Sequence, residues 1–418
     1  VFMEKELNEI KFDLKKYGQE HLLNNFDKLD ESKQKRLLEQ LSNIDYELIN
    51  GLYNGTKKEI KNEKDTIEPI EYLDKFKLNE KYKIYEGIGK TAIKEGKLAV
   101  VTMAGGQGTR LGHSGPKGTY DIGLDSHKSL FELLADGIKE EAKKYDVTIP
   151  WFIMTSRENN EETVKFFEKN KFFGYQKDKN IFFFKQGELP MVDTEGKILI
   201  GEDGLVKEAA DGHGGIYEAL VKNGMTKKMK ELGVEWVFIG GVDNCLVKMV
   251  DPVLMGIAID KNVSVAGKSI VKANPHEKVG VFCKKNGKPY VIEYSEITDE
   301  MAEAVDKDGE LLYGESHILC NLFRIDAIER MGSNPLPYHI AYKKAKYIDK
   351  DGNLVEPESP NAYKFEAFLF DAFGEVDDIA VLRVKREEEF APVKNADSAG
   401  VDCPKTARKL YEDFYHLK

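Results

Sequence analysis

The chain has 418 residues, which is too long for one small hydrophobic core, so we expect two or three domains. Its 41 % hydrophobic and 32 % charged residues are typical of a soluble globular protein, and no apolar run is long enough to span a bilayer. The net charge of -11 argues against nucleic acid as a partner, because a sequence-independent grip on DNA or RNA needs a basic face. A small anionic substrate stays compatible with this charge, since a few placed lysines act locally.

The beginning of the chain and its cysteines favour the cytoplasm. Met3-Glu-Lys-Glu carries alternating charges, whereas a secretory signal needs a basic stretch followed by an apolar one. The four cysteines are far apart and lack the CxxC spacing, which predicts neither zinc nor a disulfide framework (Cys245, Cys283, Cys320 and Cys403). We therefore expect a cytoplasmic protein without a membrane partner, and a monomer in preference to an obligate oligomer.

Residues 1–95 are predicted to form a mainly helical region. Apolar residues recur at helical spacing from about Glu4 to Tyr53, beginning with Leu7, Ile10 and Leu14. Asp30 has the character of an N-cap before a further helix. From Gly55 to Gly96 the chain is charged and shows few apolar periods, so we expect a connector there.

Residues 96–375 are predicted to form an open α/β domain. Short apolar runs typical of buried parallel strands begin at Leu98, Trp151, Ile181 and Trp236. Helical patterns lie between them, at Leu130–Glu141 and Glu161–Glu168, and this alternation predicts a Rossmann-like sheet covered on both faces. Farther along, Asn286-Gly287 between two apolar runs predicts a β-hairpin.

Residues 376–418 are predicted to form a short C-terminal segment. It runs from a strand near Ala380 to a helix at Thr406–His416.

The first predicted strand runs into a glycine-rich turn, Ala104-Gly-Gly-Gln-Gly. Gly105, Gly106 and Gly108 let backbone N–H groups approach a ligand that a Cβ would exclude, and Arg110 and Lys117 add positive charge nearby. The spacing fits neither a P-loop nor the dinucleotide GxGxxG pattern. A turn that only reverses the chain is the alternative interpretation, and the residues Thr109-Arg110 and Pro116-Lys-Gly argue against it.

Together with further blocks, this turn resembles the eukaryotic-type UDP-N-acetylhexosamine pyrophosphorylases, of the group that includes UDP-glucose pyrophosphorylases. The resemblance covers roughly Lys97 to the C-terminus and rests on short blocks in the same order (103–112, 115–124, 184–190, 211–217, 241–244, 274–280, 292–297, 321–323, 360–366 and 392–398). It implies a GT-A-like nucleotidyltransferase core with an open mixed sheet. It also implies an enzyme that makes UDP-N-acetylglucosamine and pyrophosphate from UTP and N-acetylglucosamine 1-phosphate.

The resemblance assigns the phosphates to three catalytic cations and the glycine turn. Arg110, Lys117 and Lys394 are expected to neutralise charge on the triphosphate and on the departing pyrophosphate. Ala104, Gly105 and Gly106 are expected to hold the nucleotide. Lys364, which we place on an amphipathic helix with Phe365, Phe368 and Leu369, matches a fourth cation that reaches the phosphates.

The remaining assignments concern the base, the metal and the sugar. Gln186 and Gly212 are expected to contact the uracil, with His213 beside them in the Asp211-Gly-His-Gly-Gly turn. Asp243 follows a strand and is expected to bind Mg²⁺, or Mn²⁺, together with phosphate and water. Glu293 and Asn321 are expected to contact the sugar. Without the resemblance, each would be read as an ordinary turn, cap or surface residue.

Two alternatives stay open at this point. A UDP-glucose or broad UDP-sugar pyrophosphorylase keeps the chemistry and changes the sugar; His213 favours it, because N-acetylhexosamine enzymes usually carry Asn there. A UDP-sugar sensor would keep the fold without catalysis, but such a protein could lose the phosphate-facing cations that this chain retains. Only a short tail follows Lys394, whereas animal and fungal relatives carry a longer β-rich domain, so statements about that domain do not transfer.

Overall fold

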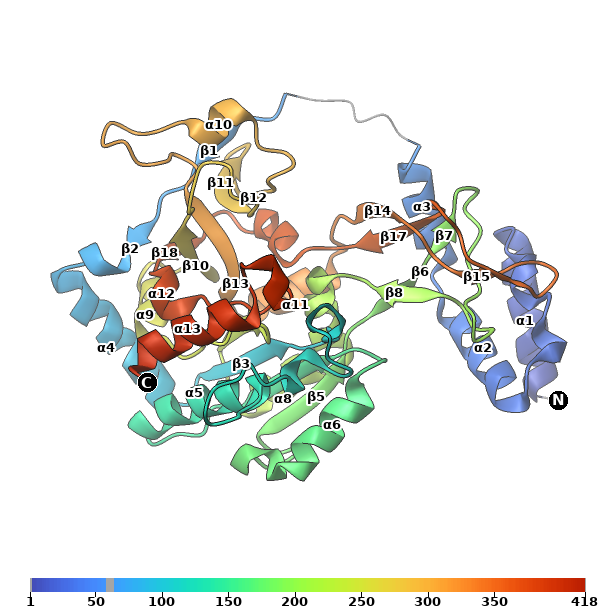
Figure 1. Ribbon diagram of the computed structural model, residues 1–418, viewed down its shortest axis with the longest axis horizontal. Coiled ribbons are helices and arrows are strands. Elements are labelled where there is room, and N and C mark those ends of the chain that lie inside the picture. Colours follow the sequence, from blue (N-terminus) through green and yellow to red (C-terminus); the bar gives the residue numbers. More distant parts are fainter. Residues whose placement is uncertain (1, 58–63, 418) are drawn as a thin grey trace. The chain divides into compact units, whose positions relative to one another are not determined.

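A computed structural model describes residues 2–57 and 64–417, and these form two compact units (Figure 1). The first unit combines Val1–Glu63, Gly187–Gly215 and Leu336–Phe368; the second combines Lys64–Gln186, Ile216–Pro335 and Leu369–Lys418. The units are therefore interleaved along the chain, whereas the boundaries expected after residues 95 and 375 follow chain order. The second unit contains both the α/β region and the C-terminal segment.

The first unit packs three α-helices and short sheets around their own core. Its helices are α1 (Phe2–Lys16), η1 (Glu20–Leu23), η2 (Phe26–Lys28), α2 (Glu31–Asn43), α3 (Tyr46–Gly55) and η7 (His213–Gly215). Its strands are the three-stranded sheet β14 (His339–Lys343), β17 (Ala362–Glu366) and β7 (Val192–Asp193), and the pairs β6 (Glu188–Pro190) with β8 (Glu208–Ala210) and β15 (Tyr347–Ile348) with β16 (Leu354–Val355). The predicted helices and cap are confirmed: Ile10 and Leu14 are buried, and the Asp30 side chain accepts from Lys33 N.

The second unit is built on a mixed sheet with the strand order β2-β18-β10-β13-β9-β3-β4-β5. These strands are β2 (Leu73–Asp74), β18 (Ala380–Arg383), β10 (Val265–Val271), β13 (Glu315–Arg324), β9 (Trp236–Gly241), β3 (Leu98–Met103), β4 (Trp151–Thr155) and β5 (Ile181–Lys185). From β9 to β5 all pairings are parallel, whereas β13 runs antiparallel to both of its neighbours. The open mixed α/β sheet expected from the sequence is confirmed.

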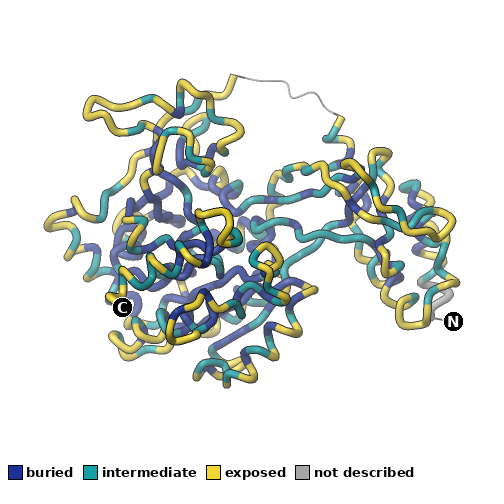
Figure 2. The backbone as a smooth tube through the Cα atoms, in the orientation of Figure 1, coloured by how far each residue is buried: buried dark blue, intermediate teal, exposed yellow. Residues whose placement is uncertain are grey.

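Helices bury both faces of this sheet. All six residues of β3 are buried, as an interior parallel strand requires, and the sheet strands are dark in Figure 2. The α-helices of the unit are α4 (Glu80–Lys94), α5 (Leu130–Lys144), α6 (Asn160–Lys169), α7 (Ile216–Lys222), α8 (Met225–Glu231), α9 (Pro252–Asp260), α10 (Asp299–Glu303), α11 (Ile325–Ser333), α12 (Arg386–Glu389) and α13 (Pro404–Tyr415). Its 3₁₀ segments are η3 (Lys75–Lys77), η4 (Thr109–Leu111), η5 (Lys117–Thr119), η6 (Lys171–Gly174), η8 (Leu369–Glu375) and η9 (Asp397–Ala399). None of the described helices is long and apolar enough to cross a membrane.

The predicted hairpin is confirmed by its turn. Strands β11 (Val281–Lys285) and β12 (Lys288–Ile292) pair antiparallel, and β11 also pairs with β1 (Ile67–Pro69). Asn286 and Gly287 between them have φ of 51° and 78°. Two positive φ angles are what a two-residue type I′ turn needs, which explains the Asn-Gly pair.

The prediction of a connector between Gly55 and Gly96 is wrong for most of this segment. Residues 58–63 of the segment lie outside the described residues. The remainder forms β1, β2, η3 and the four-turn helix α4, which packs against α9. The two backbones touch at glycines: a Cβ built on Gly89 would lie 1.8 Å from Pro252 O, and one on Gly256 would lie 1.8 Å from Tyr85 O. Because this helix buries its face partly through glycine, its apolar period is weak in the sequence.

We therefore expect Gly89→Ala to destabilise the protein by about 1–3 kcal/mol, because the new methyl group forces α4 and α9 apart. The matched control is Gly87→Ala on the same helix, where no described atom lies within 4 Å of the added carbon. That control should stabilise by up to about 1 kcal/mol through helix propensity. Urea unfolding of both variants measures the difference, and equal effects would contradict the close packing.

Candidate active site

The carboxyl ends of β3 and β9 lie side by side because the two strands are parallel neighbours, with Val101 opposite Ile239. β3 runs into the glycine turn 104–108, and β9 is followed two residues later by Asp243. Val242 N donates to Met103 O at 3.1 Å, which joins the two loops just beyond the strands. Open α/β sheets bind ligands at this edge, so the glycine turn and Asp243 meet where a site is expected.

The conformation of the glycine turn is fixed by contacts with Gln186 and Asn159. Gly105 packs against the Gln186 side chain so closely that an added Cβ would lie 2.2 Å from Oε1, and this contact brings a predicted base-binding residue to the turn. Gly106 is exposed, and no described atom lies within 4 Å of a Cβ built on it. The buried Asn159 donates through Nδ2 to Ala104 O (2.9 Å) and Gly106 O (3.3 Å). The sequence did not reveal Asn159, which lies outside every motif.

Three predicted cations gather at this turn. Lys117, half-buried at the start of η5, donates its backbone N–H to Gly106 O at 3.1 Å. Burial lowers the pKa of Lys117, the positive charges of Arg110 and Lys394 act in the same direction, and Asp243 opposes them. Arg110, Lys394 and Asp243 are therefore all close enough to Lys117 to act on its charge. Their excess of positive charge is suited to an anion such as a phosphate.

Lys394 reaches this cluster because its segment lies along the turn after β9. Val393 N donates to Asp243 O at 2.8 Å, and Ala391 N donates to the Asn244 side-chain oxygen at 2.9 Å. Asn244 also donates to Glu389 O at 2.9 Å. Asn244 is thus a positioning residue that the sequence did not single out, although it follows Asp243 in the same motif.

A buried ion network anchors the same segment. The ammonium of Lys268 on β10 lies 2.8 Å from Asp251 Oδ2 and 2.6 Å from Glu389 Oε1, and all three side chains are at most 4 % exposed. Lys75 approaches both carboxylates at 3.3 and 3.7 Å. Although burial favours the neutral amine, the two carboxylates raise the pKa of Lys268. No periodicity or motif marks Lys268, because a lysine in a strand is ordinarily an exposed residue.

The two predicted sugar residues lie just after β12 and on β13, the strands that pair with β11. Glu293 follows β12, and a Cβ built on Gly280 would lie 3.7 Å from its Oε1. Asn321 on β13 is fully buried, and its Nδ2 lies 3.0 Å from Nε2 of His317. The strand β11 joins the two regions, since Val281 pairs with both Ile292 and Ser316.

The other three predicted residues belong to the first unit. Gly212 has φ of 83°, and a Cβ added to it would lie 2.3 Å from Ala367 O. The backbone of Ala367 therefore approaches Gly212 closely. The His213 ring lies 5.4 Å from that of Phe368. The helix predicted around Lys364 is wrong: Lys364 lies on β17, which is paired on both sides, and its ammonium pairs with Glu366 at 2.5 Å. The pairing with β14 and β7 overrides the helix-like spacing of Phe365, Phe368 and Leu369.

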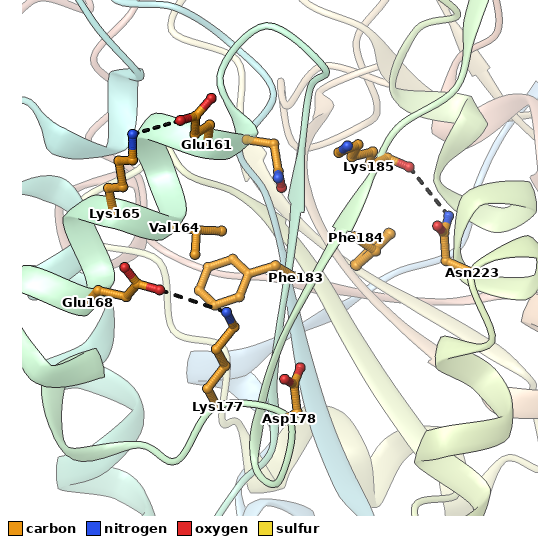
Figure 3. Close-up of a pocket in the computed structure, with 11 residues that line it drawn as sticks. Glu161, Val164, Lys165, Glu168, Lys177, Asp178, Phe183, Phe184, Lys185 and Asn223 are labelled. Carbon is orange, nitrogen blue, oxygen red and sulfur yellow. Dashed lines mark hydrogen bonds and ion pairs between the residues drawn. The ribbon is translucent and has the colours of Figure 1, made fainter. Parts of the chain in front are cut away.

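A hollow of about 580 Å³ along the edge strand β5 contains none of the clustered charged residues (Figure 3). Its walls carry lysines and acidic residues in equal number, and two of the lysines are paired: Lys165 with Glu161 at 2.6 Å along α6, and Lys177 with Glu168 at 3.8 Å. Opposite charges that neutralise one another give no preference for an anion. The glycine turn is therefore the better candidate site.

An open mixed α/β sheet with a glycine turn, a carboxylate and clustered cations at its strand ends defines a nucleotide-binding fold of the nucleotidyltransferase class. Residues 47–403 match the model of the UTP–glucose-1-phosphate uridylyltransferase family. The chain belongs to this family, which confirms the resemblance drawn from the sequence blocks.

Several relatives within the family are similar over nearly the whole chain. UDP-N-acetylglucosamine pyrophosphorylase of Saccharomyces cerevisiae is 38 % identical over 94 % of this chain and 87 % of its own length. UDP-N-acetylglucosamine diphosphorylase 2 of Arabidopsis thaliana is 38 % identical over 95 % and 82 %. The solved uridine diphosphate N-acetylglucosamine pyrophosphorylase of Trypanosoma brucei, in complex with an inhibitor, aligns with a TM-score of 0.82 at 31 % identity, covering 95 % of this chain and 82 % of that one.

The buried network predicts that Lys268→Met destabilises the protein by about 3–5 kcal/mol, because Asp251 and Glu389 lose their central cation. Although burial alone would raise the pKa of Asp251, Lys268 lowers it below its ordinary value. The carboxylate therefore stabilises the fold above its unfolded pKa, and this stability is lost as the pH falls through the lowered folded value.

The destabilisation by Lys268→Met should accordingly shrink in strongly acidic solution. Denaturant unfolding from neutral to acidic pH measures it, with the exposed Lys165→Met as the control that changes little at any pH. A loss of the same size at every pH would show that packing, not charge, carries the effect.

Proposed function

We propose that this chain is a uridylyltransferase that makes UDP-N-acetylglucosamine and pyrophosphate from UTP and N-acetylglucosamine 1-phosphate. The observation that carries the proposal is the gathering of Arg110, Lys117, Lys394 and Asp243 beside the glycine turn. Membership of the uridylyltransferase family supports the reaction, and the names of the relatives at 38 % identity support the sugar.

The reaction is a displacement at the α-phosphorus of UTP. The triphosphate lies over Ala104–Gly106, and the amide of Gln186, which has both a donor and an acceptor, contacts the uracil edge. An oxygen of the sugar phosphate attacks in line, a new P–O bond forms, and the bond to the β-phosphate oxygen breaks. Pyrophosphate leaves towards Arg110 and Lys117, whose charges stabilise the transition state.

This chemistry asks for no protein nucleophile and no general base. The attacking phosphate oxygen is already anionic, and the leaving pyrophosphate is stabilised by charge. Positioning and neutralisation therefore supply the rate, as they do in phosphoryl transfer. All four cysteines are buried, and burial raises the pKa of Cys245 to about 12, so this thiol beside the Asp243 turn is protonated at neutral pH.

The residues at the turn fit a magnesium ion that is shared with the substrate. Within the described residues, no group of three or more His, Cys, Asp and Glu side chains could form a metal site made of protein alone. Mg²⁺ is commonly held by one or two carboxylates together with phosphates and water, and Asp243 supplies such a carboxylate. Bound Mg²⁺, or Mn²⁺, would offset negative charge on the phosphates.

The preference for N-acetylglucosamine rests on the relatives and on the sequence blocks around Asn274, Glu293, Asn321 and Asn395. His213 favours glucose. Solved UDP-glucose enzymes share the fold at much lower identity, such as 17 % at a TM-score of 0.63 for UDP-glucose phosphorylase of Trypanosoma brucei. A pocket that admits an acetamido group does not firmly exclude a sugar without it, so we expect slower turnover of glucose 1-phosphate.

A panel of sugar 1-phosphates with UTP, scored by release of pyrophosphate, tests the function. We expect the highest kcat/KM with N-acetylglucosamine 1-phosphate and a lower value with glucose 1-phosphate. A higher value for glucose 1-phosphate would overturn the sugar assignment. Release of pyrophosphate with none of the sugars would contradict the proposed enzymatic activity and favour a UDP-sugar sensor.

The four buried, free cysteines also support our proposal that the enzyme works in the cytoplasm.

Lys117→Ala and Lys394→Ala should each lower kcat by about two orders of magnitude, because each removes a charge that stabilises the transition state, worth about 3 kcal/mol. Lys165→Ala, a surface lysine in the β5 hollow, is the matched control and should keep normal turnover. Steady-state kinetics with thermal unfolding separates lost chemistry from lost folding. Near wild-type turnover in either of the first two variants would contradict its role.

Asp243→Asn should raise the Mg²⁺ concentration needed for half-maximal rate, since the amide has no charge to attract the ion. The substitution leaves the backbone carbonyl that accepts from Val393 N, so the Lys394 segment should stay in place. Titration of the EDTA-treated enzyme with Mg²⁺ measures the shift. An unchanged metal dependence would show that Asp243 has a structural role only.

A further inference from the structure

The strand β13 carries a bulge at the position where Asn321 lies. Gly267 on β10 pairs with Asn321 and Ser269 pairs with His317, so the single residue Lys268 stands opposite three residues of β13. The middle one, Leu319, has φ of 56°, a left-handed conformation that is unfavourable for a residue with a Cβ. Bulges of this kind recur next to active sites, where they redirect side chains.

This bulge brings together two side chains that a regular strand would hold apart. Residues four apart on an extended strand are about 13 Å apart along it. Here the side chains of His317 and Asn321 are joined, with Asn321 Nδ2 at 3.0 Å and Oδ1 at 3.3 Å from His317 Nε2. The shorter contact has the amide donating to the ring nitrogen, which leaves Oδ1 to accept a hydrogen bond from another group.

His317 is fixed from both sides. Its ring makes edge-on contacts with Phe282, Phe370 and Phe373, at centroid distances of 5.1, 5.4 and 5.8 Å. Its backbone N–H donates to Gly280 O at 2.9 Å, and Gly280 is the residue beside which the Glu293 carboxylate lies. His317 therefore lies between the two side chains that the sequence assigns to the sugar.

We propose that His317 is a positioning residue for the sugar phosphate: through its hydrogen bond it fixes the orientation of the Asn321 amide. The proposal rests on the uridylyltransferase function proposed above. It concerns the sugar side of that site and makes no demand on the glycine turn, which is held by Asn159. Loss of the hydrogen bond should consequently weaken binding of the sugar phosphate and leave binding of UTP unchanged.

Three variants test the proposal. His317→Phe keeps a ring against the three phenylalanines and removes the nitrogen, and we expect the KM for N-acetylglucosamine 1-phosphate to rise about five- to tenfold, with the KM for UTP unchanged. His317→Gln restores an acceptor for the Asn321 amide and should recover most of the loss. Phe282→Leu is the packing control: it removes a ring that touches His317 but keeps the hydrogen bond, so it should lower thermal stability without changing either KM.

Several results would overturn the proposal. These are an unchanged sugar-phosphate KM in His317→Phe, equal changes in both KM values, or a rise in Phe282→Leu as large as that in His317→Phe. If His317→Phe does not fold, His317→Gln against Phe282→Leu decides: a sugar KM close to wild type in the former is required. A wild-type protein that releases no pyrophosphate with any sugar phosphate contradicts the proposed function itself, a different failure from these.

Discussion

The candidate site depends on holding like charges together. Burial lowers the pKa of Lys117; the carboxylate of Asp243 opposes this shift, and the positive charges of Arg110 and Lys394 add to it. In the absence of an anion these groups repel one another, so the fold has to hold them in place. Their arrangement gives a triphosphate a fixed set of charges to meet, and little reorganisation is then needed during the reaction.

The groups that hold the cations in place are neutral or belong to ion pairs. Lys117 is tied to the glycine turn by its backbone, and the segment of Lys394 is tied to the turn after β9 by Asn244. Beneath that segment, Lys268 joins Asp251 and Glu389 in a buried network, and the same lysine stands opposite the bulge that carries Asn321. The side chain of Lys268 therefore anchors the phosphate side of the site, while its backbone lies opposite the bulge on the sugar side.

Much of this architecture could be predicted from the sequence, for particular reasons. Strands such as Leu98–Met103 are buried on both faces and read as unbroken apolar runs, and the Asn286-Gly287 turn requires two positive φ angles that few residues adopt. The glycine turn, Arg110 and Lys117 were singled out because they lie close together in one motif, whereas Lys394 was singled out only through the family resemblance of a distant block. Helix α4 was missed because glycine contacts replace apolar side chains where it meets α9, and the strand around Lys364 was missed because its partners come from distant segments.

The supporting residues could not be predicted, because their roles arise from contacts across the fold. In the sequence, Asn159 and Glu389 resemble ordinary polar residues. Only the fold shows that Asn159 donates to the glycine turn and that Glu389 pairs with Lys268. His317 and Asn321 are four residues apart on a strand, and side chains at this spacing do not touch in a regular strand. Their contact depends on the bulge, which the sequence does not reveal. Local sequence carries the groups expected to touch the substrate, whereas tertiary structure decides what orients them.

The central claim is that this chain transfers the uridylyl group by positioning and charge neutralisation, without a covalent intermediate on the protein. The configuration at the α-phosphorus tests it most directly. With UTP made chiral by sulfur at that phosphorus, a single in-line attack by N-acetylglucosamine 1-phosphate inverts the configuration, so the account predicts inversion in the UDP-sugar. Retention would require two successive displacements through a uridylylated side chain, and it would contradict the account.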